Sequence, residues 1–270
     1  MSALDLADAS IYYEVHAPIE QAAYRPLILI AGLASDSQSW LPRVVRALSQ
    51  QRLVVTLDNR GCGRTEYQGE ISIEQMASDC LTLADHLDLA SVDLLGHSMG
   101  GMIALTAARQ RPHQVNRMVL CNSSAKQSAR NRRLFDDWSQ TYSEQGPTAA
   151  WYRNLFYWLL TPDFFEDRHA LDELVHMVMA YPHAPSATDY RQQGQAVATF
   201  DALAWLHDVQ TPTLVMAASD DLLFPPGKDA SGLAALPNVE VNLISGQSHS
   251  MPMLAPDVLI ESASRFLNQP

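Results

Sequence analysis

Short apolar runs alternate with longer amphipathic stretches along most of this chain. Many of these runs are nearly continuous in Leu, Ile and Val, which is typical of strands buried on both faces. We predict strands at residues 11–16, 26–31, 53–58, 91–95, 115–121, 211–217 and 239–244. We predict helices, from apolar residues at helical spacing, at residues 40–49, 73–89, 99–110 and 256–267. This alternation predicts an α/β fold in which right-handed crossovers build a mostly parallel sheet flanked by helices.

One segment, residues 125–205, interrupts the alternation because it contains no convincing strand pattern. It is rich in aromatic residues, and prolines divide it into several short helices. These prolines are Pro147, Pro162, Pro182 and Pro185. We therefore expect a core domain formed by residues 1–124 and 206–270, with residues 125–205 inserted as a helical cap, or lid. We expect the cap to lie over the carboxyl ends of the strands, where functional groups gather in such sheets.

The sequence Gly-His-Ser-Met-Gly-Gly at residues 96–101 lies between a predicted strand and a predicted helix. A serine at such a turn projects its hydroxyl from the edge of the sheet. The turn is so tight that side chains two positions before and after the serine would collide, which explains Gly96 and Gly100. This pattern predicts a nucleophile elbow with Ser98 as the nucleophile.

A serine hydroxyl is a weak nucleophile unless a base removes its proton, and that base needs a carboxylate to orient it. His249 lies in the polar loop after the last predicted strand, so it is the candidate base. Asp220 and Asp221 both follow the predicted strand 211–217, where a carboxylate can reach a neighbouring histidine. The residues alone leave both acids as candidates.

Acyl transfer to a serine also needs N–H donors for the oxyanion of the tetrahedral intermediate. The N–H of Met99 lies at the start of the predicted helix 99–110 and benefits from the helix dipole. We expect the second donor of this oxyanion hole to be the N–H of Leu33. This residue lies in the loop after the predicted strand 26–31, where Gly32 lets the backbone approach closely.

These motifs resemble the α/β-hydrolase superfamily over essentially the whole chain. The likeness rests on residues 96–101, on Asp-Asn-Arg-Gly-Cys-Gly-Arg at 58–64, on the strand and turn leading to Asp221, and on Gly-Gln-Ser-His at 246–249. Two segments, 32–40 and 218–223, are similar to the branch that contains 3-oxoadipate enol-lactonases and aminoacrylate hydrolases. Many relatives have His-Gly where this chain has Ala31-Gly32, but the backbone donor itself survives that change.

The resemblance implies a serine hydrolase, without cofactor or metal, that cleaves a small ester, lactone or related acyl compound through an acyl-enzyme. It implies the catalytic triad Ser98, Asp221 and His249, in the chain order that this fold uses. It favours Asp221 over Asp220, because Asp221 precedes Pro225 by the four positions usual for this turn. An acyltransferase with the same triad and a non-catalytic ligand receptor on the same fold are the alternatives.

Three differences from other branches of the superfamily narrow the expected reaction. Haloalkane dehalogenases and epoxide hydrolases carry aspartate at the elbow, where this chain has Ser98. Carbon–carbon bond hydrolases usually show Gly-Pro-Gly where residues 32–35 read Gly-Leu-Ala-Ser. Some relatives place the acid after the predicted strand 115–121, but Asn-Ser-Ser at 122–124 offers no carboxylate, which also favours Asp221.

Composition and charge set limits on partners and compartment. The 270-residue chain has a net charge of −12, which argues against nucleic acid and anionic membranes, because phosphate binding needs clustered Lys and Arg. The three cysteines, Cys62, Cys80 and Cys121, show no C-x-x-C spacing and predict a reducing compartment without disulfides. We see no targeting pattern and no run of about 20 apolar residues, so we expect a soluble, cytoplasmic protein. Its expected partners are a small acyl substrate and water.

The cap segment supplies candidate pocket residues. Small-molecule sites are mostly apolar, so we expect Trp138, Trp158 and Phe165 to line the substrate pocket. Three basic residues share a predicted helix face at the start of the cap: Lys126, Arg130 and Arg133. They could hold a substrate carboxylate, but a solvated face is the favoured interpretation. We expect His97 to be structural, and we expect no catalytic role for Cys62, since no base is indicated near it.

Overall fold

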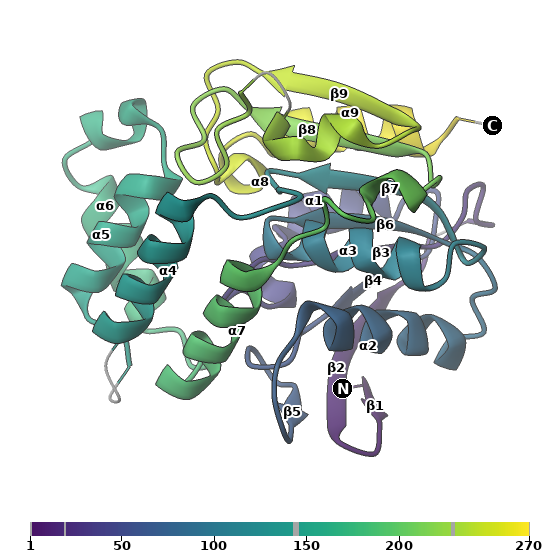
Figure 1. Cartoon of the computed structure of the whole chain (residues 1–270), viewed down its shortest axis with the longest axis horizontal. Helices are drawn as coiled ribbons and strands as arrows, with labels where there is room; N and C mark the ends of the chain where they lie inside the picture. Colours follow the sequence, from purple (N-terminus) through teal and green to yellow (C-terminus); the bar gives the residue numbers. More distant parts are fainter. Residues whose placement is uncertain (1, 19, 143–145, 228–229, 270) are drawn as a thin grey trace.

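A mostly parallel sheet runs through the structure, a computed structural model that describes residues 2–18, 20–142, 146–227 and 230–269 (Figure 1). The strand order is β1-β2-β4-β3-β6-β7-β8-β9, and β5 pairs with β2. The parallel strands are β3 (Leu27–Ile30), β4 (Val54–Leu57), β6 (Val92–His97), β7 (Val115–Cys121), β8 (Thr213–Ala218) and β9 (Val239–Ile244). The antiparallel part consists of β1 (Ser2–Asp5), β2 (Ala9–His16) and β5 (Glu66–Tyr67).

Helices cover both faces of this sheet. The helices of the core are α1 (Pro42–Leu48) and α9 (Pro256–Leu267) on one face, and α2 (Ile73–His86) and α3 (Met99–Gln110) on the other. Leu27 and Leu29 of β3 pack in the α1–α9 layer, whereas Ile28 and Ile30 pack in the α2–α3 layer. Successive strand residues thus enter opposite layers, which explains why the strands read as unbroken apolar runs.

The seven predicted strands all occur, with ends that differ by two residues at most. Two strands, β1 and β5, were missed. β1 buries only one of its four residues, and β5 has only two residues, so neither leaves an apolar pattern in the sequence. The predicted helix 73–89 was too long, because α2 ends at His86 and Asp88 adopts a φ of 55° that a helix cannot continue through.

The segment between β7 and β8 is helical, as Figure 1 shows. Its main helices are α4 (Ala129–Thr141), α5 (Ala149–Leu159), α6 (Ala170–Met179) and α7 (Ala187–Thr199), with the 3-10 helices η2 (Pro162–Glu166) and η3 (Leu206–Asp208). Ser128, Thr148 and Ser186 begin α4, α5 and α7 by accepting a hydrogen bond from a first-turn N–H. We call residues 125–205 the cap segment; its status as a separate domain stays a prediction.

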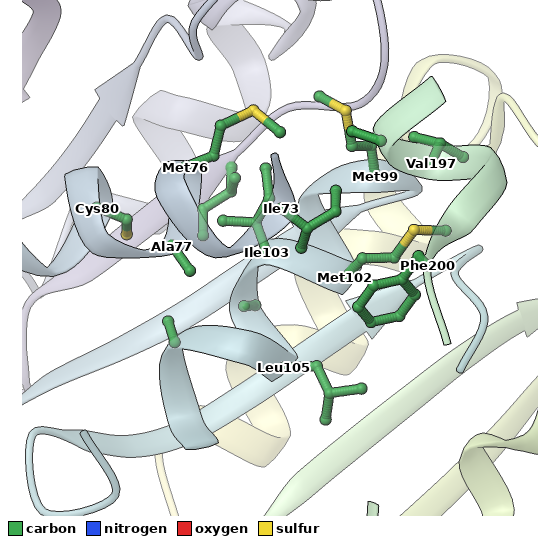
Figure 2. Close-up of a cluster of buried hydrophobic side chains, with 14 of the residues drawn as sticks. Ile73, Met76, Ala77, Cys80, Met99, Met102, Ile103, Leu105, Val197 and Phe200 are labelled. Atoms are coloured by element: carbon green, nitrogen blue, oxygen red, sulfur yellow. The ribbon is translucent and has the colours of Figure 1, made fainter. Parts of the chain in front are cut away.

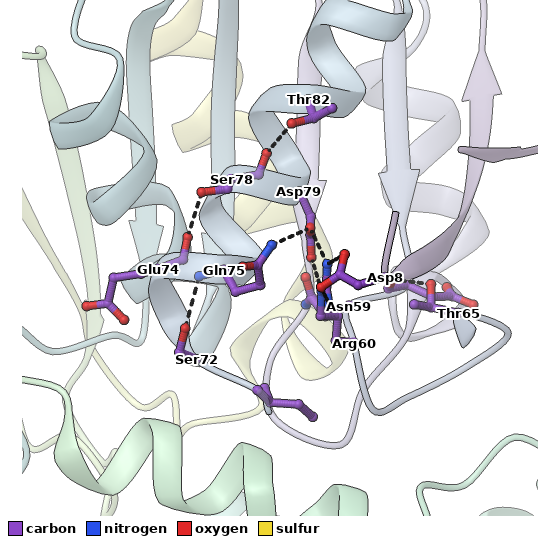
Figure 3. Close-up of polar contacts among 12 residues, drawn as sticks. Asp8, Asn59, Arg60, Thr65, Ser72, Glu74, Gln75, Ser78, Asp79 and Thr82 are labelled. Atoms are coloured by element: carbon purple, nitrogen blue, oxygen red, sulfur yellow. Dashed lines mark hydrogen bonds and ion pairs between the residues drawn. The ribbon is translucent and has the colours of Figure 1, made fainter. Parts of the chain in front are cut away.

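The segment 58–64 braces the loop that follows β3. The Arg60 guanidinium is fully buried and pairs with Asp79 of α2 and with Asp8 (Figure 3). Asp58 accepts a hydrogen bond from the N–H of Ser37 (2.9 Å), and Asn59 donates one to the carbonyl oxygen of Ala31 (3.2 Å). The charged motif therefore holds both ends of the loop 31–37 against the sheet.

Candidate active site

Ser98 occupies a sharp turn between β6 and α3. Its backbone has a φ of 55° and a ψ of −117°, which residues with a side chain rarely adopt. A Cβ atom on Gly96 would lie 2.1 Å from the carbonyl oxygen of Gly100, and one on Gly100 would lie 2.0 Å from that of Ile30. The expected reason for both glycines is therefore confirmed. The Ser98 N–H donates to the carbonyl oxygen of Cys121 (2.9 Å), which fastens the turn to β7.

Ser98, His249 and Asp221 form one chain of hydrogen bonds at the carboxyl edge of the sheet. The Oγ of Ser98 lies 3.0 Å from Nε2 of His249, and Nδ1 of His249 lies 2.9 Å from Oδ2 of Asp221. The three side chains come from the loops after β6, β9 and β8, and each residue is at most 9% exposed. The structure thus brings together the three residues that the sequence analysis selected.

The surroundings of Asp221 determine the protonation of this chain. Burial opposes ionisation of the carboxyl, but the His249 charge and several hydrogen-bond donors outweigh it and lower the pKa of Asp221. The donors are His249, Asn122 (2.8 Å) and the N–H groups of Leu223 (2.8 Å) and Phe224 (2.9 Å). An ionised carboxylate only accepts, so Nδ1 of His249 donates to it, and in the neutral imidazole Nε2 is then the acceptor that faces the Ser98 hydroxyl. This imidazole is oriented to take the proton of that hydroxyl.

The two candidate acids occupy different environments. Asp221 is 2% exposed and reaches His249, whereas Asp220 is exposed and accepts a hydrogen bond from the hydroxyl of Ser219 (3.0 Å). Sequence reasoning treated Asn122 only as a missing acid. In the structure its amide donates to Asp221 and to the carbonyl oxygen of Ser248 (3.1 Å), so it ties the acid to the histidine loop.

The loop that carries His249 is held from two sides. Nε2 of His97 lies 2.9 Å from the carbonyl oxygen of His249, and since a carbonyl oxygen accepts, this nitrogen donates. On the other side, the hydroxyl of Ser248 (2.7 Å) and the N–H of Ser250 (3.1 Å) both donate to the carbonyl oxygen of Leu159 at the end of α5. The cap segment is therefore in direct contact with the histidine loop.

His97 should make stability depend on pH. Desolvation, followed by the nearby His249 charge, lowers the pKa of His97 from 6.5 to about 3. Between these two values the unfolded chain binds a proton that the folded protein does not, so the free energy of unfolding should fall as pH decreases below 6.5. A His97→Gln variant keeps a donor for His249 but does not titrate. From pH 7.5 to pH 5.5 it should lose about 1 kcal/mol less stability than the wild type in urea unfolding. Equal losses in both proteins would contradict a neutral His97.

The loop 31–37 lies against the elbow. A Cβ atom on Gly32 would be 3.3 Å from Cβ of Ser98, so the backbone beside Leu33 runs next to the hydroxyl-bearing residue. The N–H of Ser35 donates to the carbonyl oxygen of Gly32 (3.3 Å) and closes a turn around Leu33 and Ala34. Met99 is the first residue of α3 and is fully buried. Both expected oxyanion donors are thus placed at the elbow, and their role stays a prediction.

The three candidate pocket aromatics take part in packing within the cap segment. Trp138 is buried, donates through its indole N–H to Asn154 (2.9 Å) and packs edge-on against Trp158. Phe165 stacks on Tyr157, with ring centroids 5.2 Å apart. These contacts show packing within the cap segment, and a role in lining the substrate pocket stays a prediction for all three.

The basic residues at the start of the cap do not share one helix face. Lys126 precedes α4 and forms an ion pair with Asp201 (2.7 Å), because the two residues meet in an isolated β-bridge. The exposed Arg130 donates to the carbonyl oxygen of Leu222 and lies over the ring of Trp158. The expectation of a shared face was therefore wrong for Lys126, and these contacts favour a role on the surface.

A cavity of about 430 Å³ lies between the start of α4 and the loop that follows Asp221. Leu223 and Phe224 line it on one side, and Gln127 and Asn131 on the other. The ring of Phe224 also packs against the imidazole of His249, with centroids 5.2 Å apart. Phe224 therefore contacts both the cavity and the imidazole of His249.

The environments of the three cysteines favour structural roles. Cys62, Cys80 and Cys121 are unpaired and buried, and burial raises the pKa of each thiol, which disfavours the reactive thiolate. Within the described ranges we find no group of three or more His, Cys, Asp or Glu placed to hold a metal ion. None of the helices in the described part of the chain has the length and apolar character needed to cross a membrane.

A comparison of the sequence with protein-family models indicates the family to which this chain belongs. The family model for the alpha/beta hydrolase fold matches residues 25–256, which is most of the chain. The chain belongs to the α/β-hydrolase family. It is a hydrolase of this fold, with a mostly parallel sheet flanked by helices, as the resemblance implied. The family assignment therefore rests on a match that includes the elbow and both loops that carry Asp221 and His249.

Two relatives with similar sequences carry the same name. The protein named "Putative carbamate hydrolase RutD" of Agrobacterium fabrum is 32% identical over 262 residues, which cover 95% of this chain and 98% of that protein. Its namesake in Rhizobium rhizogenes is 30% identical, with 95% and 97% covered. This chain and these α/β-hydrolase relatives therefore align along nearly their full lengths.

Solved structures of other hydrolases share the fold. MGS-M2, an alpha/beta hydrolase enzyme from a Medee basin deep-sea metagenome library, matches with a TM-score of 0.88 at 22% identity, covering 100% of this chain and 98% of that one. The enol-lactonase of Burkholderia xenovorans matches with a TM-score of 0.86 at 22% identity, covering 99% and 100%. At this level of identity the comparison shows the α/β-hydrolase fold alone.

Proposed function

We propose that this α/β-hydrolase is a serine hydrolase that cleaves a small ester, lactone or related acyl compound with Ser98, His249 and Asp221. One observation carries the proposal. A single imidazole joins a buried serine hydroxyl at 3.0 Å to a buried carboxylate at 2.9 Å, although the three residues are far apart in the sequence. This arrangement matches the requirements for activating a serine as a nucleophile.

In the proposed mechanism, Oγ of Ser98 attacks the substrate carbonyl carbon while Nε2 of His249 accepts the hydroxyl proton. Asp221 holds the imidazole in the required tautomer and stabilises the imidazolium that forms. The N–H groups of Met99 and Leu33 stabilise the oxyanion. His249 then delivers its proton to the leaving group, and water attacks the acyl-enzyme with His249 again as the base. No step of this mechanism needs a cofactor.

The names of the relatives support an acyl substrate. The RutD proteins are named as carbamate hydrolases, and a solved neighbour is an enol-lactonase. Carbamates and lactones both present an electrophilic carbonyl carbon with a heteroatom leaving group. We therefore include carbamates among the related acyl compounds that this chain should hydrolyse.

We also propose that the cap segment covers the reacting groups as a lid, and that the protein works in the cytoplasm. The first proposal is supported by the contacts of Leu159 with the histidine loop. The second is supported by three unpaired, buried cysteines, which fit a reducing compartment.

Covalent labelling combined with turnover tests the function. We expect a fluorophosphonate to add once per chain, at Ser98 by peptide mass spectrometry, because the hydroxyl of Ser98 lies 3.0 Å from Nε2 of His249. We expect many turnovers per enzyme molecule on at least one member of a panel of short esters, lactones and carbamates. Labelling without turnover would favour a receptor. Preferential transfer of the acyl group to an added alcohol or thiol, rather than to water, would favour an acyltransferase.

A further inference from the structure

A buried glutamine of the cap segment connects three parts of the chain. Gln193 lies on α7 and is fully buried. Its Oε1 accepts a hydrogen bond from the N–H of Ala34 (2.8 Å), and its Nε2 donates one to the carbonyl oxygen of Arg60 (2.6 Å). Both ends of the amide are thus occupied, which fixes the side chain in one orientation. Nothing in the sequence pattern singles out this residue, because its partners lie far away along the chain.

The partner of Oε1 belongs to an unusual turn. The turn is closed by the hydrogen bond from Ser35 to Gly32, and Leu33 and Ala34 form its centre. Ala34 has a φ of 56°, in the left-handed region that is unfavourable for a residue with a Cβ atom. In turns of this kind, a flip of the central peptide returns the second central residue to negative φ. The turn around Leu33 therefore needs an external contact to hold its central peptide.

Gln193 supplies this contact. The N–H of Ala34 is part of the central peptide, so the hydrogen bond to Gln193 opposes the flip directly. The contacts of Asn59 with Ala31 and of Asp58 with Ser37 hold the two ends of the loop, outside the central peptide. Asp58 and Asn59 thus hold the ends of the loop 31–37, whereas Gln193 holds its central peptide.

We infer that Gln193 is a positioning residue: by holding the central peptide at Ala34 it keeps the turn in place, and with it the neighbouring Gly32–Leu33 peptide, whose N–H is assigned to the oxyanion. The inference rests on the proposed function, because it assigns Leu33 to the oxyanion hole. The same helix also packs against the element that carries the other donor. Val197 and Phe200 belong to one apolar cluster with Met99 and Met102 of α3 (Figure 2). The cap segment therefore contacts the turn around Leu33 through Gln193 and lies beside α3 through Val197 and Phe200 (Figure 2).

Steady-state kinetics of two glutamine variants test the inference. Gln193→Met keeps the approximate length of the side chain and removes both hydrogen bonds. We expect kcat for p-nitrophenyl acetate to fall by about 10- to 100-fold with KM within about twofold, a smaller loss than the hundredfold to thousandfold from deleting a donor. The pH profile of kcat/KM should keep its shape, because the triad is unchanged.

Gln192→Met is the matched control. Gln192 is the preceding residue of α7, and its amide oxygen also accepts from a backbone N–H, that of Ile71 (3.0 Å), which is not part of the loop 31–37. We expect the kcat of Gln192→Met to stay within about twofold of the wild type. A single hydrogen bond between neutral groups contributes only modestly to stability, and this one does not contact the loop 31–37. Thermal unfolding of both variants separates loss of fold from loss of kcat.

A second substitution tests the conformational argument. Glycine adopts positive φ without steric cost, so Ala34→Gly in the Gln193→Met background should recover at least part of the lost kcat. Three outcomes would overturn this inference and leave the proposed function standing. They are a wild-type-like kcat in Gln193→Met, equal losses of kcat in the two glutamine variants, and no recovery of kcat in the double variant. Absence of turnover that depends on Ser98 in the wild type would overturn the proposed function, and this inference with it.

Discussion

Replacing Ser98 with alanine should abolish turnover of p-nitrophenyl acetate, with a loss in kcat on the order of a millionfold, the size found when a triad nucleophile is removed from a serine protease. The reason is that alanine leaves His249 with no hydroxyl to deprotonate, and no acyl-enzyme can form. The measurement is the kcat of purified wild type and variant, with equal thermal unfolding as evidence that both are folded. Ser78→Ala, which removes a helix-surface hydroxyl of α2 bonded to the carbonyl oxygen of Glu74, is the control and should keep full activity. Near-wild-type turnover in Ser98→Ala would rule out the mechanism.

Asp221→Asn should lower kcat/KM by about 10⁴-fold, the effect of the same change in a serine protease triad. The hydrogen bonds of Asp221 explain this expected loss of kcat/KM. The oxygen of the new amide would keep accepting from the N–H groups of Leu223 and Phe224, which places the amide NH2 toward His249. The imidazole would then have to accept at Nδ1 and carry its proton on Nε2, where it could no longer accept the proton of Ser98.

The neighbouring acid gives a matched comparison for this variant. Asp220→Asn makes the same chemical change one residue earlier, at an exposed side chain bonded to Ser219. We expect its kcat/KM to stay within a few-fold of the wild type, because exposed polar contacts contribute little. A larger loss at Asp220 than at Asp221 would reverse the assignment of the acid.

The contacts of the cap segment connect its position to the reacting groups. Leu159 of α5 holds the histidine loop through Ser248 and Ser250, and Gln193 of α7 holds the turn around Leu33. A displacement of these helices would therefore act on the proposed base and on the oxyanion hole together. This coupling explains how residues outside the sheet can affect catalysis without touching the substrate.

Some residues of the site could be recognised from local patterns. Ser98 stands out because Gly96 and Gly100 are needed within four residues of chain, and the structure shows the close approaches that require them. His249 and the pair Asp220 and Asp221 stand out because they follow predicted strands, and parallel strands end at one edge. Local spacing was sufficient for Ser98 because its constraint is itself local, whereas it left Asp220 and Asp221 as alternatives.

Other parts were missed because their partners are distant in sequence. Asn122 contacts Asp221 across 99 residues, and Gln193 contacts Ala34 across 159. Lys126 was assigned to a helix face, but its pairing with Asp201 holds it in an extended bridge before α4. The strand β1 was missed because its register with β2, rather than an apolar run, keeps it in the sheet.

The sequence by itself determined the alternation of strands and helices, the elbow at Ser98 and the order of the three triad candidates, because these features follow from periodicity and from steric limits within a few residues. Only the tertiary structure decided which acid meets His249, how Asn122 and His97 hold the histidine loop, and that Gln193 reaches Ala34. These contacts form when loops distant along the chain meet at one sheet edge, and neither residue of a pair carries a local sign of its partner.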